Sequence, residues 1–346
     1  MHKTVLTLLS FALLITLQAQ SSLRTVFTEG EPGTKNNFYV DLQDDEDNSS
    51  SIPISVLTGK TAGPVFTIIA GVHGVEYSSI IAAHELLQEV DVEQLKGTVI
   101  IIPLSNPSAF YGRTPFLNPQ DELNLNRVFP GKVNGTITER IAHFITTEVI
   151  PVSDVFIDMH GGDANEDLLS FIGYYNNEGQ PENTATIKRL AEASGFGYVV
   201  SWPYTLKADQ PAKYAFKQAV QDGKVALTIE AGKLGNVQAD AVHLIKNGIY
   251  NLLAENGNYG SAPKETVDFV YLNEQDYIKA PEQGLFFSEY SAGDQVEAGV
   301  TIGVIKDAFG ALITTVTTPV AGTILYKIGT PPVNVGETVV CVGYRL

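Results

Sequence analysis

The organisation of the chain follows from one stretch, Ile68-Ile69-Ala70-Gly71-Val72-His73-Gly74-Val75-Glu76-Tyr77. Its first part continues an apolar run that lies between Pro64 and Gly71, so residues 66–70 are predicted to form a buried strand. Apolar residues then recur at helical spacing over 77–91, which predicts a helix. The polar residues of the stretch therefore lie where a strand passes into a helix, the position at which open α/β sheets usually bind ligands.

His73 and Glu76 are the first candidate ligands of a metal ion. An imidazole and a carboxylate three residues apart on such a turn can both face one cation, and zinc accepts both types of ligand. A pair at this spacing also occurs often by chance, so two residues alone do not make a site. The metal hypothesis therefore depends on whether the chain also supplies a third ligand, a general base and a group that binds an anion.

The composition is that of an ordinary folded protein. The chain has 346 residues, 44% of them hydrophobic and 18% charged, which is enough for one large domain and a smaller one. Its formal net charge of −17 argues against nucleic-acid binding, because phosphate contacts require clustered Lys and Arg. Cys341 is the only cysteine, so an internal disulfide and a thiolate metal cluster are both excluded, and we expect a buried small side chain.

The N-terminus predicts export. Lys3 precedes an almost wholly apolar run over 5–17, and Ala19 provides the small residue of a cleavage site. The apolar run is shorter than the roughly 20 residues of a spanning helix, so a signal peptide is expected over residues 1–20, with an uncleaved anchor as the alternative. Export without disulfides indicates a bacterial periplasmic or extracellular protein whose mature chain has no membrane span.

Strands and helices alternate over residues 21–256. Strands are expected over 37–42, 52–57, 66–70, 97–104, 154–160, 169–175, 198–201 and 225–232, and helices over 77–91, 136–150, 183–194, 210–221 and 239–253. This alternation predicts an α/β domain with a mixed, mostly parallel sheet flanked by helices, and the first two strands are expected to form an edge hairpin. The polar passage 108–134 has little periodicity, and we expect it to form a wall of the site because loops of this length are usually functional.

A second, all-β domain is expected over residues 257–346. Asn, Gly, Ser and Pro are frequent over 257–264, and beyond this linker only short strands separated by glycines are predicted. The pattern V-x-x-G-x-x-I at 296–302 is echoed at 333–339, which predicts a small β-sandwich or barrel of two related halves. The halves resemble biotinyl and lipoyl domains, but no lysine lies between Asp307 and Tyr326 to carry a cofactor, so a structural or gating role is inferred.

His160 completes the candidate ligand set. It follows a predicted buried strand and precedes two glycines, which leave room beside its ring. With His73 and Glu76 it makes two imidazoles and one carboxylate, a set that leaves zinc a fourth position for water. The remaining histidines are expected to be ordinary boundary or surface residues, because they lie within predicted helices: His84, His143 and His243.

Three charged residues are candidates for the remaining parts of a catalytic site. Glu230 ends an apolar strand, where it would either pair with a neighbouring cation or act beside the metal as a general base. Arg113 and Arg127 lie in the long polar passage. They are either solvated loop charges or the donors for a substrate carboxylate and a developing oxyanion.

Four motifs in this order resemble the succinylglutamate desuccinylase and aspartoacylase family of the zinc-carboxypeptidase superfamily. They are His73-x-x-Glu76, Asn126-Arg127 with Phe129-Pro130-Gly131, His160 after Asp158-Met159, and Ile229-Glu230-Ala231-Gly232. The resemblance extends from about residue 64 to the C-terminus, because many bacterial members also end in a β-rich module. Each motif is weak alone, whereas four in order, with a predicted strand before three of them, are specific.

The resemblance implies one Zn²⁺ per chain, held by His73, Glu76 and His160, with Glu230 as the general base. The family usually has Asp at the position of Asn124, and in related enzymes that Asp orients a zinc-bound imidazole. A neutral amide can accept the same hydrogen bond, but it would raise the basicity of the ligand less.

For the substrate, the resemblance implies that Arg113 polarises the scissile carbonyl and that Asn126 and Arg127 bind a carboxylate. The expected activity is zinc-dependent hydrolysis of the amide bond in a small N-acyl amino acid or a related carboxylate-bearing molecule. One alternative is an exported zinc metallocarboxypeptidase that acts on peptides, including those of the cell wall. The other is a non-catalytic protein that binds zinc or a carboxylate.

Overall fold

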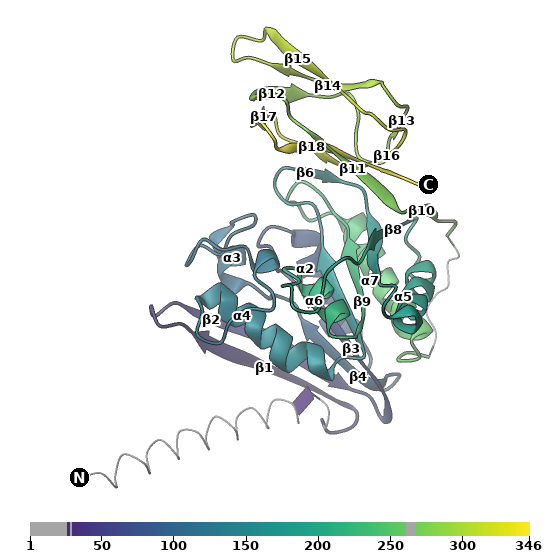
Figure 1. Ribbon diagram of the computed structural model, residues 1–346. Coiled ribbons are helices and arrows are strands. Elements are labelled where there is room, and N and C mark those ends of the chain that lie inside the picture. The colour runs from purple at the N-terminus through teal and green to yellow at the C-terminus, as the bar shows by residue number, and fades with distance from the viewer. Residues whose placement is uncertain (1–25, 28–29, 261–266) are drawn as a thin grey trace, which may run out of the picture.

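The computed structural model describes residues 26–27, 30–260 and 267–346, and these form a nine-stranded sheet with a smaller β module beside it (Figure 1). The large sheet has the order β1-β2-β4-β3-β5-β9-β7-β8-β10. Its strands are β1 (Thr34–Gln43), β2 (Ser49–Thr58), β3 (Thr61–Ala70), β4 (Lys96–Ile102), β5 (Val155–His160), β7 (Phe171–Asn176), β8 (Tyr198–Pro203), β9 (Val225–Glu230) and β10 (Val270–Leu272). Among these described strands five of the eight neighbouring pairs are parallel, which confirms the predicted mixed, mostly parallel sheet.

Helices cover both faces of this sheet. One face carries α2 (Tyr77–Glu89), α5 (Pro181–Ala193) and α7 (Ala239–Glu255), and the other carries α4 (Ile137–Phe144) and α6 (Ala215–Gln221). Successive residues of a strand point to opposite faces, so in β5 Phe156 packs into one core and Ile157 into the other. Both faces are therefore buried, which explains the nearly continuous apolar runs of the central strands.

The segment between β4 and β5 is more ordered than its sequence predicts. It contains α3 (Pro107–Gly112) and a short 3-10 helix (Leu125–Arg127). Thr136 caps α4 in a reciprocal capping box with Glu139. The helical path then continues through a π turn (Ile145–Val149) and a 3-10 turn (Ile150–Val152). The polar passage between β4 and β5 is therefore anchored by two short helices, α3 and the 3-10 helix, and its polar side chains project from them.

The C-terminal module consists of two antiparallel sheets that share one apolar core. One sheet contains β11 (Glu274–Lys279), β18 (Thr338–Tyr344), β16 (Gly322–Ile328) and β13 (Gln295–Val296), and the other β15 (Leu312–Thr317), β14 (Thr301–Lys306), β12 (Gly284–Phe287) and β17 (Pro332–Val333). The two repeated sequences correspond to β13–β14 and β17–β18, which cross between the sheets in opposite senses. Gly299 and Gly336 lie at the equivalent turns with φ of +80° and +84°, a conformation that favours glycine.

Two strands that the sequence did not predict connect the large domain to the module. β6 (Glu166–Leu168) leaves the large domain after β5 and pairs with β16, so that Glu166 lies opposite Ile328. β10 lies beyond residue 257 and pairs with β8, so the chain returns to the large sheet before it enters the module. Both contacts join distant segments, which explains why local sequence patterns gave no sign of them.

The predicted signal peptide, residues 1–20, lies outside the residues that the structure describes. Among the residues that it describes, no helix combines the length and the apolar character that crossing a membrane would require. Cys341 is a buried, free cysteine, as expected. Its side chain lies in β18, where it faces the junction between the two domains.

Candidate metal and substrate site

The central strands bring the candidate residues together. β3, β5 and β9 are parallel neighbours, so their carboxyl ends lie at one edge of the sheet. The turn after β3 carries His73, β5 ends at His160, and Glu230 ends β9 directly opposite His160 in the register of the two strands. Gly74 allows the first turn to pass close to α3, because a Cβ there would lie 2.3 Å from the backbone of Ala109.

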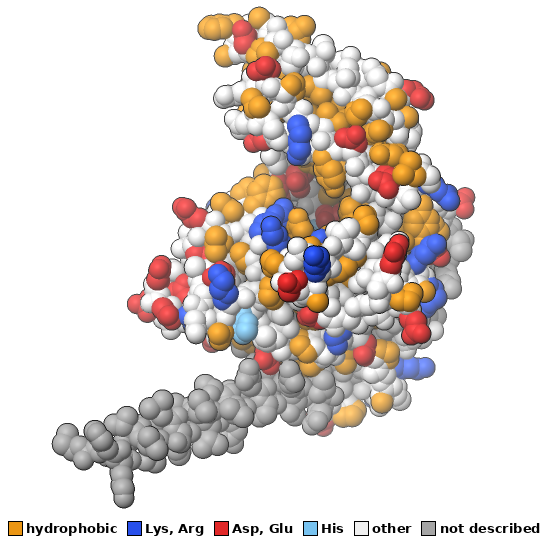
Figure 2. Space-filling view, in the orientation of Figure 1, with side chains coloured by type: hydrophobic (Ala, Val, Ile, Leu, Met, Phe, Trp, Pro, Cys, Tyr) orange, Lys and Arg blue, Asp and Glu red, His pale blue; other side chains and the backbone are white. Residues whose placement is uncertain are grey.

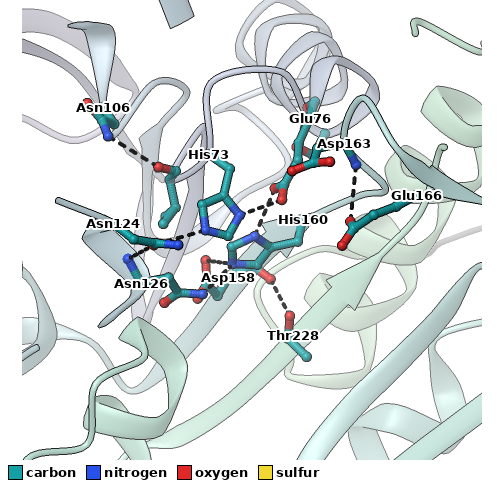
Figure 3. A network of polar contacts seen from close by, with 12 residues as sticks. His73, Glu76, Asn106, Asn124, Asn126, Asp158, His160, Asp163, Glu166 and Thr228 are labelled. Carbon is teal, nitrogen blue, oxygen red and sulfur yellow. Dashed lines mark hydrogen bonds and ion pairs between the residues drawn. The ribbon is translucent and has the colours of Figure 1, made fainter. Parts of the chain in front are cut away.

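His73, Glu76 and His160 form the compact buried group that the sequence predicted (Figure 3). The Nδ1 atom of His73 lies 2.6 Å from one carboxylate oxygen of Glu76, and the Nδ1 atom of His160 lies 2.8 Å from the other. The three ligand atoms all lie within 4.8 Å of one another. Two imidazoles and one carboxylate that converge in this way can hold a single metal ion.

The outer nitrogen of each imidazole has its own partner. The Nε2 atom of His73 lies 3.2 Å from the side-chain oxygen of Asn124, and the Nε2 atom of His160 lies 3.0 Å from a carboxylate oxygen of Asp158. Oxygen acceptors at these positions favour the tautomer that is protonated on Nε2 and leave the Nδ1 lone pair toward Glu76. Asn124 is therefore placed to accept the hydrogen bond that the resemblance implies for the residue at this position.

The electrostatics of the group favour a cation. Burial alone would raise the pKa of Glu76, but the two neighbouring imidazoles lower it to about 2. Burial would lower the pKa of His160, but the carboxylates of Asp158 and Glu76 raise it well above its usual range. The group therefore favours positive charge between the two imidazoles and the carboxylate, and a metal ion can supply that charge.

Glu230 lines the same cavity as the three ligands. Burial raises its pKa well above the usual range for a carboxyl group, and the carboxylates of Glu76 and Glu166 add to this effect although the imidazole of His160 opposes it. A carboxyl group beside the ligands of a metal ion can accept a proton from water and return it to a leaving group. The position and the environment of Glu230 therefore fit the predicted general base.

The cavity has a volume of about 600 Å³ and lies at the junction of the two domains. Figure 2 shows this hollow, with acidic side chains inside it and basic side chains at its edges on both the large domain and the β module. The α/β domain supplies its floor, and the β module contributes Tyr277, Tyr326 and Glu337 to its roof. A volume of this size accommodates a small molecule.

Asn126 and Arg127 both line the cavity. The side-chain oxygen of Asn126 accepts a hydrogen bond from the backbone N–H of Ala215 at 3.0 Å, which places the first turn of α6. This contact explains why α6 begins at Ala215 and not at residue 210 as predicted. Arg127 extends over the ring of Tyr214, 4.8 Å from its centre, and its guanidinium donates a hydrogen bond to the backbone oxygen of Asn126 at 2.6 Å.

Arg113 and the remaining histidines lie away from this cavity. Arg113 is exposed at the end of α3, where it adopts φ of 54°, and it does not line the cavity. His84 and His243 are exposed on α2 and α7, and His143 is half-buried on α4. None of these three histidines belongs to the metal-binding group among the described residues.

Sequence reasoning missed several residues of the site. The role of Asp158 could have been found, because it precedes His160 by two positions in a strand and so points to the same face. Asp163 lies in the loop after β5, Glu166 begins β6, and both lie near Glu76 (Figure 3). Tyr326 comes from β16 in the other domain, and no local pattern connects such residues with the site.

Comparison with known protein families gives a match over most of the large domain. The family model of the succinylglutamate desuccinylase/aspartoacylase catalytic domain matches residues 62–256. The N-alpha-acetyl-L-2,4-diaminobutyric acid deacetylase of Halomonas elongata is 30% identical over 263 residues, which cover 74% of this chain and 74% of that protein. The sequence similarity therefore extends beyond the four motifs.

Solved structures show the same two-domain arrangement. A succinylglutamate desuccinylase/aspartoacylase from Rhodobacter sphaeroides has a TM-score of 0.81 and 26% identity, covering 92% of this chain and 97% of that chain. The product-bound ectoine utilization protein EutE (DoeB) from Ruegeria pomeroyi has a TM-score of 0.81 and 26% identity, covering 91% and 98%. Together with the geometry of the site, these matches show that the chain belongs to the succinylglutamate desuccinylase/aspartoacylase family.

Proposed function

We propose that the protein is an exported zinc-dependent deacylase that hydrolyses the amide bond of a small N-acyl amino acid. The observation that carries this proposal is the meeting of the His73, Glu76 and His160 ligands with Glu230 in one cavity. The names of the relatives support the same reaction class, because one is a deacetylase of an acetylated amino acid. Export rests on the apolar N-terminal run, and the N-terminal residue of the secreted protein would test it.

The donor set fits zinc. Two imidazole nitrogens and one carboxylate are the protein ligands of many catalytic zinc sites, and such a set leaves one position open. Bound there, zinc would lower the pKa of water toward about 7 and polarise a carbonyl oxygen. The hydrogen bonds that the two rings donate to the side-chain oxygens of Asn124 and Asp158 hold them in the orientation that this set requires.

Glu230 moves the proton in this proposal. Its carboxylate removes a proton from the attacking water as the water oxygen adds to the carbonyl carbon. When the C–N bond breaks, the same carboxyl group delivers that proton to the leaving nitrogen, so that the products are a carboxylic acid and a free amine. The raised pKa of Glu230 favours retention of the proton between the two steps.

The substrate is held by groups on both sides of the reacting amide. The guanidinium of Arg127 can bind the carboxylate of the amino acid, and its stacking on Tyr214 limits the positions that it can adopt. Asn126 presents its amide beside His160, with its nitrogen 3.5 Å from the Nε2 atom of that ring. We assign no role to Arg113, because its side chain is exposed outside the cavity.

The main alternative is a metallocarboxypeptidase. The β module argues against it, because Tyr277 and Tyr326 of this module line a cavity of about 600 Å³, a volume typical of a site for small molecules. Rates on N-acetyl and N-succinyl amino acids, compared with rates on free peptides, would distinguish the two activities. Faster cleavage of the peptides would reject the deacylase.

The central experiment is the substitution Glu230→Gln in the zinc-loaded protein. We expect kcat to fall by about 10²- to 10⁴-fold, because the proton acceptor is lost. Zinc content, measured by elemental analysis, should remain at one ion per chain. Glu337→Gln is the control, since this carboxylate also lines the cavity but bonds within its own turn to Asn334.

A Glu230→Gln variant that retains both zinc and full activity would remove the general base from the proposal. A wild-type protein that binds zinc tightly but hydrolyses no amide in the panel would instead support the non-catalytic binding protein. Circular dichroism of each variant would show whether the fold is intact.

A further inference from the structure

The cavity has two chemically different ends. Near Tyr326, the carboxylates of Glu166 and Glu337 add to the effect of burial in raising the pKa of the Tyr326 hydroxyl. The other end is lined mainly by aromatic rings, and we name it the aromatic end. Its rings come from β7, β8, α6, the residue before α6, and β11 of the module: Phe171, Tyr175, Trp202, Phe216, Tyr214 and Tyr277. The two ends therefore suit different chemical groups.

The large sheet brings the aromatic end next to the proposed general base. Phe171 of β7 lies opposite Glu230 of β9. Two residues further along β7 is Gly173, where a Cβ would lie 2.6 Å from the ring of Trp202. Because Gly173 has no side chain, the indole can lie against the sheet, with its centre 6.2 Å from that of Phe171 and 5.7 Å from that of Tyr175. The rings thus form a wall that begins beside Glu230.

Further contacts hold this wall in place. Phe216 stacks on Tyr175, with the ring centres 5.0 Å apart and the ring planes at 21°. The backbone N–H of Phe216 donates a hydrogen bond to a carboxylate oxygen of Asp158 at 3.4 Å, which fixes this ring relative to β5. Tyr277 comes from the β module and lies beside Trp202. The hollow between the rings is therefore preformed, so little loss of conformational freedom would oppose the entry of a ligand.

Three of these rings keep accessible surface. Tyr277 is 52% exposed, and Trp202 and Tyr214 are half-buried. Covering apolar surface is favourable, and the faces and edges of aromatic rings suit a further ring in an offset-stacked or edge-on position. A neutral, ring-bearing group of a ligand would therefore be stabilised at the aromatic end.

The charges near the rings disfavour a charged ligand group. The guanidinium of Arg127 lies 4.8 Å from the centre of the Tyr214 ring. The Nζ atom of Lys217 lies 4.7 Å from the ring centre of Tyr175 and 5.9 Å from that of Tyr214. These two cations would repel an ammonium group placed at the same rings. A carboxylate would meet the negative faces of the rings, and among the described residues that line the cavity Arg127 is the only Lys or Arg.

The position of the substrate carboxylate determines which group reaches the rings. In the proposed function Arg127 binds this carboxylate, and its stacking on Tyr214 places it at the aromatic end. Burial raises the pKa of Tyr175 and the charge of Arg127 opposes this shift, so Arg127 also lies near a second ring of the aromatic end. The side chain of an amino acid is bonded to the same carbon as its carboxylate. The side chain can therefore enter the aromatic end, whereas the acyl group extends from the other side of the amide.

We propose that the aromatic end binds the side chain of the substrate, and that the preferred substrates are N-acyl amino acids with a neutral, ring-bearing side chain. N-acyl amino acids whose side chains carry an ammonium group or a carboxylate would be poor substrates. This inference rests on the proposed deacylase function. It extends that function by naming the chemical class of the substrate and the rings that select it.

The test compares substrates that share the acetyl group and differ in the side chain. We expect the zinc-loaded enzyme to hydrolyse N-acetylphenylalanine with a kcat/KM at least about tenfold above that for N-acetylalanine, because only the first has a ring to bury. N-α-acetyl-2,4-diaminobutyrate and N-acetylaspartate should be poorer still, because their charged side chains would lose water without gaining an opposite charge.

Two substitutions remove ring surface from the aromatic end. Tyr277→Ala and Trp202→Leu should each lower kcat/KM for N-acetylphenylalanine by about 5- to 50-fold, mainly through KM, and should lower the value for N-acetylalanine far less. Tyr111→Ala is the matched control and should leave the ratio of the two values unchanged, since Tyr111 is exposed and does not line this cavity. Because both substrates are measured on the same sample, a folding defect cannot imitate a changed ratio.

A ring on the acyl group is the other source of the same chemistry. N-phenylacetylalanine carries its ring there, and we expect it to be hydrolysed more slowly than N-acetylphenylalanine and to respond little to Tyr277→Ala. A faster reaction of N-phenylacetylalanine that is lost in Tyr277→Ala would assign the rings to the acyl group and overturn the side-chain site.

The outcomes separate this inference from the proposed function. Equal kcat/KM for N-acetylphenylalanine and N-acetylalanine, or an unchanged ratio in Tyr277→Ala, would overturn the aromatic site and leave the deacylase intact. Hydrolysis of none of these substrates would reject the deacylase. Calorimetric binding of free phenylalanine and alanine to wild type and Tyr277→Ala would then decide on the aromatic site by itself. Tighter binding of phenylalanine that weakens in the variant would support the site, and equal binding of the two amino acids would overturn it.

Discussion

The floor and the roof of the cavity are built in different ways. The floor consists of residues at the ends of the adjacent parallel strands β3, β5 and β9, where backbone pairing fixes the relative positions of His160 and Glu230. The roof comes from a separate β module that contacts the large domain through the pairing of β6 with β16, through a hydrogen bond from the backbone N–H of Ala292 to Asp167, and through an apolar cluster in which Leu325 and Cys341 meet Phe171. The floor is thus built within one continuous sheet, whereas the roof is placed by contacts between two domains.

This difference suggests that the floor and the roof have different functions. Metal binding and proton transfer require positions that are accurate to fractions of an ångström, which a sheet provides. Selection among substrates requires a surface that can vary without disturbing the floor, which a separate module provides. We therefore expect changes in the floor to abolish the reaction and changes in the roof to alter the choice of substrate.

The largest effect should come from the floor. His160→Ala removes one of three ligands, so we expect zinc content to drop far below one ion per chain and kcat to fall by more than about 10³-fold. Elemental analysis and an amine-release assay measure the two quantities. His243→Ala, on the exposed surface of α7, is the control and should change neither. A metal-replete, active His160→Ala protein would contradict the ligand assignment.

A smaller effect should distinguish the two histidine ligands of the floor, His160 and His73. His160 has an anionic neighbour, Asp158, whereas His73 has a neutral one, Asn124. An anionic acceptor raises the basicity of a ligating imidazole more, so Asp158→Asn should weaken zinc binding by about 10- to 100-fold and Asn124→Asp should strengthen it. Competition with a chelator gives both affinities. Equal affinities in all three proteins would show that neither contact tunes the metal site.

The floor was largely predictable from the sequence. His73, His160 and Glu230 each follow a short apolar strand, and the rule that parallel strands gather their carboxyl ends at one edge brings them together. The role of each residue came from the resemblance to the family, which rests on the order of the four motifs. Asp158 was overlooked although its position two residues before His160 placed it on the same side of β5.

The roof was not predictable in this way. Glu166 and Tyr326 are 160 positions apart, and they meet only because β6 leaves one domain to pair with β16 of the other. The pattern of the C-terminal strands predicted a two-part β module, but it gave no information about which residues of the module face the cavity. The start of α6 was misplaced for a similar reason, because a side chain from the long loop, Asn126, determines it.

The roof should respond to Tyr326→Ala by a change of substrate range. Removal of the ring opens one end of the cavity, so we expect KM for small N-acyl amino acids to rise by several-fold, on the order of one to two kcal/mol of lost contact. The relative rate on N-acyl dipeptides should increase, and zinc content should not change. Tyr39→Ala, in an exposed position on β1, is the control. Loss of zinc in Tyr326→Ala would show that the roof also supports the floor.

The smallest effect concerns stability and pH, and it contrasts two carboxylates that line the same cavity. The pKa of Glu166 is raised to about 8, so between about pH 4.5 and 8 the folded protein binds more protons at this group than the unfolded chain does. Its contribution to stability therefore decreases as pH rises through this window. The pKa of Glu337 is lowered by hydrogen bonds within its turn, so its contribution is present above about pH 4.5 and is lost as pH falls.

The two glutamine variants should consequently change stability in opposite directions. Glu166→Gln should raise the melting temperature of the protein at pH 8.5 by about 2 °C, which corresponds to on the order of 1 kcal/mol after solvent screening, and should have little effect at pH 4.5. Glu337→Gln should lower it slightly at pH 8.5, because the ionised carboxylate is the better acceptor for the N–H groups of Asn334. Thermal unfolding at the two pH values measures both. If Glu166→Gln were destabilising at pH 8.5, the carboxylate would already have a favourable partner within the protein, contrary to the raised pKa.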